Sequence, residues 1–428
     1  MSFLKQTKSK EVINGGYDLF SMPPTDVSNL GVEYEKVFCE NFDGTDTNRS
    51  IDFHVAGNND SFIELIDSYL LLTLSIKKPD GSNLADGENI CLISDPSGIF
   101  RAIEVFLSDT LISSIQGLYN YRSFIENVLN YNSRTAQNQL DLLGIHWDNH
   151  ADTFAGDTGI QVRKRQYAGS AKKQVVMKIH SDLFNQPKYL VPRCNLKLRL
   201  HRSADAFCLL ASDNATAYKL HIDSIYLFIK RIKPSPSLQV SLLEARQKEN
   251  VVYNFNRVKL YSHLLTPGAS SYNIPLQTEN ILPNFCIVVF VKNNINYADN
   301  PFKCDHLGIK NIHLLANNTK YPRHPFEPDF AGGHVARELF ALYQLRGEEF
   351  ANSSLTISLS KYIKGYTLFA FKLSNCQGNE VSLIQSGNLR LCLDLNANLT
   401  TAYNAIIYMS STDSIEIDQY GNVLISHV

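Results

Sequence analysis

Short stretches of alternating apolar and polar residues recur along almost the whole chain and limit the folds open to it. In residues 69–77, every second position from Leu70 to Ile76 is Leu or Ile, and the turn sequence Lys-Pro-Asp-Gly follows. Successive side chains of a strand point to opposite faces, so this pattern indicates a half-buried strand. Similar stretches occupy residues 103–107, 111–112, 196–201, 220–229, 355–359, 366–373, 389–395, 405–409 and 415–418.

Several of these stretches carry finer signals. Ser108-Asp109-Thr110 separates two of them and predicts a hairpin, and a second hairpin is expected between residues 415–418 and 423–425. The strand at 220–229 is expected to bulge near Ser224. Residues 285–291 are almost continuously apolar, which is typical of a strand covered on both faces. Many short strands and few helices favour sandwiches or barrels.

Helical spacing of apolar residues is rarer and falls once in each half of the chain. It predicts helices over 121–131 and 335–346, the second ending at Gly347. Between the halves, Pro234 and Pro236 forbid a continuing strand ladder, and 238–248 suggests a short helix. We expect an N-terminal arm (1–30), a first domain (31–233), a linker (234–248) and a second domain (249–428).

The length and charge of the chain agree with two ordinary cores. The chain has 428 residues, 44% of them hydrophobic, and a formal net charge of -2. No overall field would draw it to nucleic acid or an anionic membrane, so such contacts would be local. The eight cysteines show no CxxC spacing and predict buried free thiols of a reducing compartment. Residues 1–10 lack an apolar signal region, and no apolar run predicts a membrane span.

The sequence also resembles a known family along nearly its whole length. It is similar to the major capsid proteins of Polinton (Maverick) elements and of the related adintoviruses and adomaviruses. The similar blocks, in the family's order, are Leu19 to Thr25, Val32 to Tyr34, Tyr119 to Glu126, His180 to Phe184, Arg199 to Leu209, Pro328 to Phe330, Gly365 to Phe371, Ile415 to Asp418 and Asn422 to Leu424.

This resemblance implies an all-β, hexon-like protein: two tandem eight-stranded antiparallel jelly rolls (a double jelly roll) with short inserted helices. It further implies that three copies form a pseudo-hexagonal homotrimer and that these trimers, with a single jelly-roll penton protein, tile an icosahedral shell around double-stranded DNA. The expected location is the virion capsid, after synthesis in the host cytoplasm and assembly in the host nucleus. Such a protein needs no catalytic residues, cofactor or metal, because its work is the burial of area between neighbours.

Enzyme-like patterns are weak. His146 and His150 would face one metal ion if their segment were helical, with Asp152 as a third ligand. The preceding Gly144 and the turn-forming residues between the two histidines favour a solvated loop with a packed Trp147 instead.

Two acidic patterns also have simpler interpretations than a catalytic or calcium site. Glu416 and Asp418 would lie on one face of a strand, where a solvated edge is the simpler interpretation. Asp43, Asp46 and Asn48 lack the spacing of a calcium loop.

One basic cluster stands out, formed by Arg163, Lys164 and Arg165, with Lys172, Lys173 and Lys178 following. It either contacts packaged DNA nonspecifically on the inner capsid surface or acts as a nuclear-import signal, since clustered charge suffices for phosphate contact. The alternative is a solvated loop before the strand at Val175. Charge reversal at the first three residues is expected to impair assembly or nuclear entry.

The N-terminal arm and the fold leave further alternatives. The arm is either a flexible tail or a segment that orders against another capsomer or the inner shell surface. The same fold would also suit a β-sandwich carbohydrate-binding (lectin-like) protein or a β-sandwich hydrolase. The absence of a signal peptide and the single tryptophan, Trp147, argue against the lectin, and no nucleophile or metal constellation supports the hydrolase.

Overall fold

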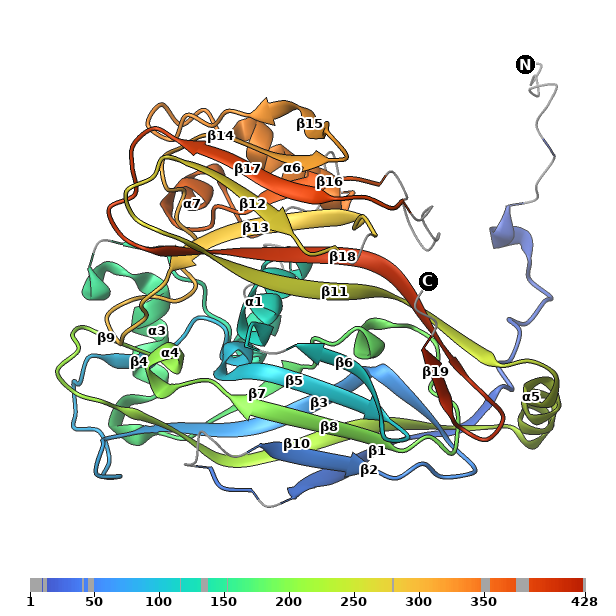
Figure 1. The fold of residues 1–428 in the computed structure, drawn as a ribbon. Helices are drawn as coiled ribbons and strands as arrows, with labels where there is room; N and C mark the ends of the chain where they lie inside the picture. Colours follow the sequence, from blue (N-terminus) through green and yellow to red (C-terminus); the bar gives the residue numbers. More distant parts are fainter. Residues whose placement is uncertain are drawn as a thin grey trace, which may run out of the picture.

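The computed structural model describes residues 10, 14–40, 42–44, 50–115, 117–131, 138–151, 153–278, 281–347, 355–374 and 385–425. Two β-rich halves lie one above the other in Figure 1, with α1 (Tyr119–Asn130) between them. No helix within these ranges is long and apolar enough to cross a membrane.

Eight strands of the first half form two four-stranded ladders. One ladder has the order β1-β10-β3-β7 and the other β2-β8-β5-β6. The end of β1 also pairs with β2, through Cys39 opposite Phe53, which joins both ladders into one sheet. The bounds are β1 (Asn29–Glu40), β2 (Ile51–Val55), β3 (Phe62–Lys77), β5 (Phe100–Leu107), β6 (Thr110–Ile115), β7 (Lys173–Lys178), β8 (Leu196–Arg202) and β10 (Lys219–Pro234).

The second half repeats this strand order. Its sheets run β11-β18-β13-β16 and β12-β17-β14-β15. In both halves, counting eight strands along the chain, one ladder is 1-8-3-6 and the other 2-7-4-5, the order of a jelly roll. The bounds are β11 (Val251–Leu265), β12 (Ser271–Leu276), β13 (Phe285–Lys292), β14 (Ile309–Ala316), β15 (Thr319–Phe326), β16 (Phe369–Lys372), β17 (Leu389–Leu395) and β18 (Tyr403–Ile417).

Two short additions accompany the jelly rolls. β4 (Ile90–Leu92) pairs with β9 (Leu209–Ala211), and β19 (Val423–Ile425) pairs with β18 as the expected terminal hairpin. The hairpin of β5 and β6 is confirmed, with Ser108 and Asp109 at positive φ as tight hairpin turns require. The bulge near Ser224 is confirmed as a register shift between Ile222 and Ser224. The fold class is therefore as expected.

The expected helices form, and others accompany them. α1 and α6 (Ala336–Arg346) match the predicted pair, and Gly347 follows α6 at φ 66° in the left-handed region. α5 (Pro236–Lys248) occupies the junction between the halves. The further helices are α2 (Gln139–Leu142), α3 (Thr158–Gln166), α4 (Asp205–Cys208), α7 (Leu359–Lys364), and the 3₁₀ turns η1 (Gly15–Tyr17), η2 (Pro96–Ile99), η4 (Phe154–Gly156), η5 (Ala168–Ser170) and η6 (Leu183–Asn185).

The prediction of a strand at residues 355–359 is wrong. Leu355 and Ile357 are buried, as the alternation indicated, but Leu359 begins α7. The side chain of Ser358 accepts a hydrogen bond from the backbone N–H of Lys361 and so caps this helix. The alternation therefore reflects burial of two side chains, and the cap residue redirects the chain into a helix.

The core continues from one half into the other. In β13, Cys286, Val288 and Phe290 belong to a cluster confined to the second half. The other face of β13, including Ile287 and Val289, belongs to the large cluster that also fills the first half. β13 is thus covered on both faces, as its apolar sequence predicted. The domain boundaries expected at 30/31, 233/234 and 248/249 stay a prediction.

Candidate assembly interface

An exposed apolar surface covers the outward face of the β1-β10-β3 part of the first half. Along β1, the alternating Val32, Tyr34 and Phe38 are 54%, 50% and 65% exposed. On β10, the half-buried outward residues alternate with core residues such as Leu227. We call this surface the aromatic strip. Its residues are Val32, Tyr34, Phe38, Tyr69, Tyr226 and Phe228.

The rings of the aromatic strip contact one another across the strands. Tyr69 stacks on Phe228 at 5.1 Å and lies 5.8 Å from Tyr34, while Phe38 meets Tyr226 edge-on at 5.5 Å. The Lys36 ammonium lies 3.6 Å from the centre of the Tyr226 ring. Such cross-strand contacts hold the rings in place, so the strip is a preformed surface rather than a set of independent side chains.

The equivalent sheet of the second half is in a different environment. Its outward face carries Val258 of β11, Ile287 of β13 and Ile406 of β18, and all three are buried in the core shared with the first half. Figure 1 shows β11 and β18 facing α1 and the first half. One of two equivalent sheets is thus covered within the protomer, and the other presents an exposed aromatic strip.

A buried charge network lies where the halves meet. Arg122 of α1 donates from Nε to Glu126 Oε1 at 2.7 Å, and its Nη2 lies 2.8 Å from Asp182 Oδ1. The other Glu126 oxygen lies 2.7 Å from His180 Nδ1, and the hydroxyl of Tyr408 on β18 donates to Glu126 at 3.2 Å. The last of these bonds connects the second half to α1.

The two carboxylates of this network differ in pKa. Burial raises the pKa of Asp182 above its usual value, although Arg122 pulls it down. Burial also opposes ionisation of Glu126, but the Arg122 charge and the hydrogen bond with His180 hold the pKa of Glu126 well below its usual range. Glu126 is therefore held in its ionised form beside the buried Arg122. The spacing of Arg122 and Glu126 at i, i+4 was visible in the sequence.

In the structure, Arg163 is separated from the accessible residues of the predicted basic cluster. Arg163 lies in α3 rather than in a loop and is fully buried. Its guanidinium donates to the carbonyl oxygens of Leu92 and His146 and pairs with Asp148 at 2.6 Å. The interpretation of Arg163 as a DNA or import contact is therefore wrong, because a buried cation already paired and hydrogen-bonded cannot reach an external phosphate.

The neighbouring basic residues keep their accessibility. Arg165 is exposed, and Lys164 is half-buried with its ammonium 2.6 Å from the side-chain oxygen of Asn89. Lys172 is exposed and pairs with Asp223. A contact of Lys164 and Arg165 with DNA or an import receptor stays a prediction.

The histidine pair lies in the expected loop. Trp147 packs edge-on against Phe124 at 5.8 Å, as the sequence indicated. His146 Nε2 lies 3.3 Å from Asp141, whereas the His150 ring lies 4.8 Å from that of Tyr366, so the two imidazoles have separate partners. Asp152 lies outside the described residues. Within the described part of the chain, no three His, Cys, Asp or Glu side chains are arranged to hold a metal ion.

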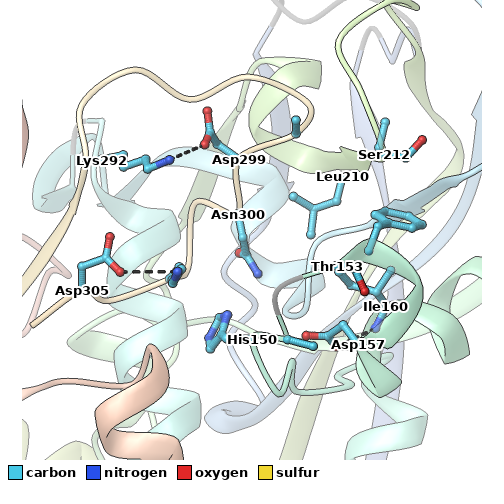
Figure 2. Close-up of a pocket in the computed structure, with 15 residues that line it drawn as sticks. His150, Thr153, Asp157, Ile160, Leu210, Ser212, Lys292, Asp299, Asn300 and Asp305 are labelled. Carbon is cyan, nitrogen blue, oxygen red and sulfur yellow. Dashed lines mark hydrogen bonds and ion pairs between the residues drawn. The ribbon is translucent and has the colours of Figure 1, made fainter. Parts of the chain in front are cut away.

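His150 borders a cavity of about 300 Å³ between the halves. Figure 2 shows it with Asp157 and with Lys292, Asp299 and Asn300 from the second half. Asn300 donates to the Asp148 carboxylate at 2.7 Å, so the carboxylate that pairs with Arg163 also connects the two halves.

The remaining acidic candidates are structural where they are described. Glu416 accepts a hydrogen bond from Asn250 at 3.0 Å. Asp418 lies beyond the end of β18 and accepts hydrogen bonds from the backbone of Tyr420 and Asn422 in the hairpin turn, so it does not pair with Glu416. Asp46 and Asn48 lie outside the described residues.

The described part of the N-terminal arm is exposed. Leu19, Phe20 and Met22 are 76%, 96% and 90% exposed. The arm runs into β1 beside α5, where the backbone N–H of Ser235 bonds the carbonyl of Ser28. Figure 1 shows the arm extending away from both halves. Whether it contacts a neighbouring capsomer stays a prediction.

Comparison with known proteins identifies the fold. No family model matches the sequence. An uncharacterized protein of Caenorhabditis elegans is 22% identical over 362 residues, which cover 80% of this chain and 85% of that protein.

Solved structures of viral capsids resemble the chain over nearly its full length. The capsid of PBCV-1 virus has a TM-score of 0.60 at 11% identity, covering 96% of this chain and 99% of that chain. The Sputnik virophage structure has a TM-score of 0.62 at 11% identity, covering 98% and 94%. The mavirus major capsid protein has a TM-score of 0.51 at 11% identity, covering 99% and 96%.

These similarities define the class of fold. At such low identity they establish architecture and leave function to be argued from the surface of the molecule. The chain has the double jelly-roll fold of viral major capsid proteins, and these structural neighbours are capsid proteins rather than enzymes.

Proposed function

We propose that this chain is the major capsid protein of a double-stranded DNA virus or Polinton-like element. Its copies form pseudo-hexagonal homotrimers that tile an icosahedral shell. The observation that carries the proposal is the aromatic strip: it lies on the sheet whose counterpart in the second half is covered by a jelly roll of the same chain. A second copy can cover the strip in the same manner.

Contacts of this kind lead to a closed ring. The first half of one copy contacts the second half of the next copy, so the interface is heterologous. A heterologous interface generates a closed ring when a whole number of copies completes one full rotation. Because each protomer supplies two jelly rolls of the same strand order, three protomers give six similar wedges around a threefold axis. The outline is then nearly hexagonal, which suits tiling.

The remaining parts of the proposal concern partners and location. The division into an arm (1–30), two jelly-roll domains (31–233 and 249–428) and a linker (234–248) is proposed for each protomer. A single jelly-roll penton protein would close the shell's fivefold vertices, and Lys164 and Arg165 would contact packaged DNA or direct nuclear import. Synthesis in the host cytoplasm and assembly in the nucleus complete the proposal.

The experiment is expression of the full chain followed by light-scattering chromatography and negative-stain microscopy. The protomer has a mass of 48.2 kDa. We expect a species of three times that mass with a hexagonal outline, and shells where trimers associate further. A stable monomer that binds sugars would contradict the proposal and support the carbohydrate-binding alternative.

A further inference from the structure

The covered sheet of the second half and the exposed sheet of the first half share one aromatic feature. Phe285 of β13 stacks on Tyr408 of β18, with the ring centres 6.0 Å apart. Tyr69 of β3 stacks on Phe228 of β10 in the same way, at 5.1 Å. In each jelly roll the two rings come from the third and the eighth strand. The elements that cover the second-half pair therefore indicate what would cover the first-half pair.

The second-half pair is covered by two elements of the first half. The hydroxyl of Tyr408 donates to Glu126 of α1 at 3.2 Å. Beside it, Arg257 Nη1 of β11 donates to the backbone carbonyl of Ile112 on β6 at 2.9 Å. β6 is the fifth strand of its jelly roll, and Figure 1 shows it on the side of the first half that faces β11. Within the protomer, a fifth strand of one jelly roll thus meets the outward sheet of the other.

The fifth strand of the second jelly roll is β15, which lies far from the aromatic strip of its own chain. Figure 1 shows β15 at the top of the second half, and β1 and β10 at the bottom of the first half. Surfaces at opposite ends of one protomer can meet only between copies, as in the head-to-tail contact of a ring. β15 is therefore placed to do between copies what β6 does within the protomer.

The shape and chemistry of β15 suit a surface of aromatic rings. Its ladder with β14 is interrupted between Tyr321 and Phe326, so residues 322–325 bulge out of the sheet. This bulge has the sequence Pro-Arg-His-Pro, in which both prolines are half-buried and the two residues between them are exposed. Pro-x-x-Pro segments are recognised by aromatic-lined surfaces, and an arginine adds attraction to the face of a ring.

The charges near Tyr34 are complementary to those of β15. Lys230, which is opposite Tyr34 in the sheet, is shared by two carboxylates, Glu64 at 2.7 Å and Asp67 at 2.5 Å. These three groups sum to one negative charge, and the Asp67 side chain is 46% exposed. β15 contributes Lys320 and Arg323, both exposed, and its sequence has no acidic residue. Opposite charges at facing positions orient two surfaces and disfavour other partners.

We infer that the Pro-Arg-His-Pro bulge of β15 covers the aromatic strip of the next copy in the ring. Pro322 and Pro325 pack against the rings of Tyr34 and Phe38, and Arg323 pairs with the carboxylates that share Lys230. This inference rests on the proposed homotrimer and names the surface of the second half that makes its contact.

A pair of introduced thiols tests the contact in the full chain. Val32 of β1 and His324 of β15 are both exposed, and their strands lie at opposite ends of the protomer, so a short crosslinker joins these positions only between copies. The Val32→Cys/His324→Cys protein, treated with a bismaleimide, should give covalent dimers and trimers on a denaturing gel. The matched control is Val32→Cys/Tyr420→Cys, because Tyr420 is exposed in the turn between β18 and β19, away from β15. It should give no more covalent oligomer than the wild-type chain, whose own cysteines set the background.

A charge reversal tests the chemistry of the contact without a crosslinker. Arg323→Glu should lower the trimerisation constant by at least about tenfold at low salt, since three contacts change in each ring. The difference should shrink at high salt, which screens exposed charges. Arg101→Glu is the control, because it makes the same reversal at an exposed residue of β5, and it should stay within about threefold of wild type.

The results separate this inference from the proposed function. A trimer that forms without a crosslink between positions 32 and 324, or that is unaffected by Arg323→Glu, would overturn the inference and leave the trimer standing. Covalent dimers from Val32→Cys alone would also overturn it, since they would place two aromatic strips face to face. A protein that stays monomeric at every concentration would remove the proposed trimer itself, and this contact with it.

Discussion

Replacing Phe38 by alanine should weaken association between protomers while each protomer stays folded. Phe38 belongs to the aromatic strip, and its side chain is 65% exposed in the isolated protomer. Little of its surface is therefore used within the protomer, and most of it is available to a neighbouring copy.

The magnitude follows from that exposed fraction. Complete burial of a phenylalanine side chain contributes about 1.5–3 kcal/mol, so burying the exposed 65% contributes roughly 1–2 kcal/mol at each contact. A closed trimer has one such contact per protomer, which gives about 3–6 kcal/mol and a loss of roughly 10²–10⁴ in the trimerisation constant. The effect on the protomer itself should stay below about 1 kcal/mol, from the smaller part that is already buried.

Analytical ultracentrifugation over a dilution series measures the trimerisation constant directly. Tyr420→Ala serves as the control, because Tyr420 is 75% exposed in the turn between β18 and β19, away from the strip. A trimerisation constant for Phe38→Ala within a factor of about three of both wild type and control would show that Phe38 is not buried between protomers.

The other predictions concern stability, charge and the arm. Arg163→Met should lower the free energy of unfolding by about 3–5 kcal/mol, because it leaves the buried carboxylate of Asp148 unpaired. Chemical denaturation measures this change, and a loss below about 1 kcal/mol, which is typical of surface residues, would contradict the burial of the Arg163 ion pair. Reversing the charges of Lys164 and Arg165 should leave stability nearly unchanged but reduce DNA retention or nuclear entry, and wild-type behaviour in both assays would dispose of that role. Burial lowers the pKa of His150 below 6.5 in the folded chain. Below pH 6.5 this imidazole therefore binds a proton more readily in the unfolded chain than in the folded chain, so the free energy of unfolding falls as the pH drops below that value. His150→Asn, which tolerates the φ of 49°, should therefore lose less Tm than wild type between about pH 7.5 and 5.5, and an equal loss would exclude this imidazole as the cause. Deleting residues 1–20 should yield shells that dissociate at lower denaturant concentration, and unchanged shell stability would show the arm to be a tail.

The strands were predictable because their signal is local. Alternation along residues 69–77 is a property of neighbouring residues, and Leu70, Leu72 and Leu74 are all buried in β3. The order of the strands in the sheets was not predictable from such patterns. β1 pairs with β10 nearly two hundred residues later, and period-two alternation carries no information on which strands pair.

Arg163 shows where a charge run misleads. Three consecutive cationic residues ordinarily indicate a solvent-exposed surface. In an α-helix, however, their side chains point to different sides of the helix. Asp157 caps α3, and Ile160, Arg163 and Tyr167 follow at helical spacing on one buried face. That spacing, together with the cap residue, was the signal that could have separated Arg163 from Lys164 and Arg165.

The sequence alone did not predict the aromatic strip, for a related reason. Val32 and Tyr34 alternate with Glu33 and Glu35, and Phe38 follows in the same phase, a pattern that would ordinarily predict a face turned toward the core. Alternation identifies an apolar face without saying whether the same chain covers it. The structure decides this point, because the opposite face of the sheet already fills the core, as Leu227 and Ile229 do.

An electron cryomicroscopy map of the purified oligomer tests self-assembly through the aromatic strip most directly. We expect threefold particles in which Tyr34 and Phe38 of one copy are buried against the second half of the next. A monomeric particle, or an oligomer in which both rings face solvent, would contradict it.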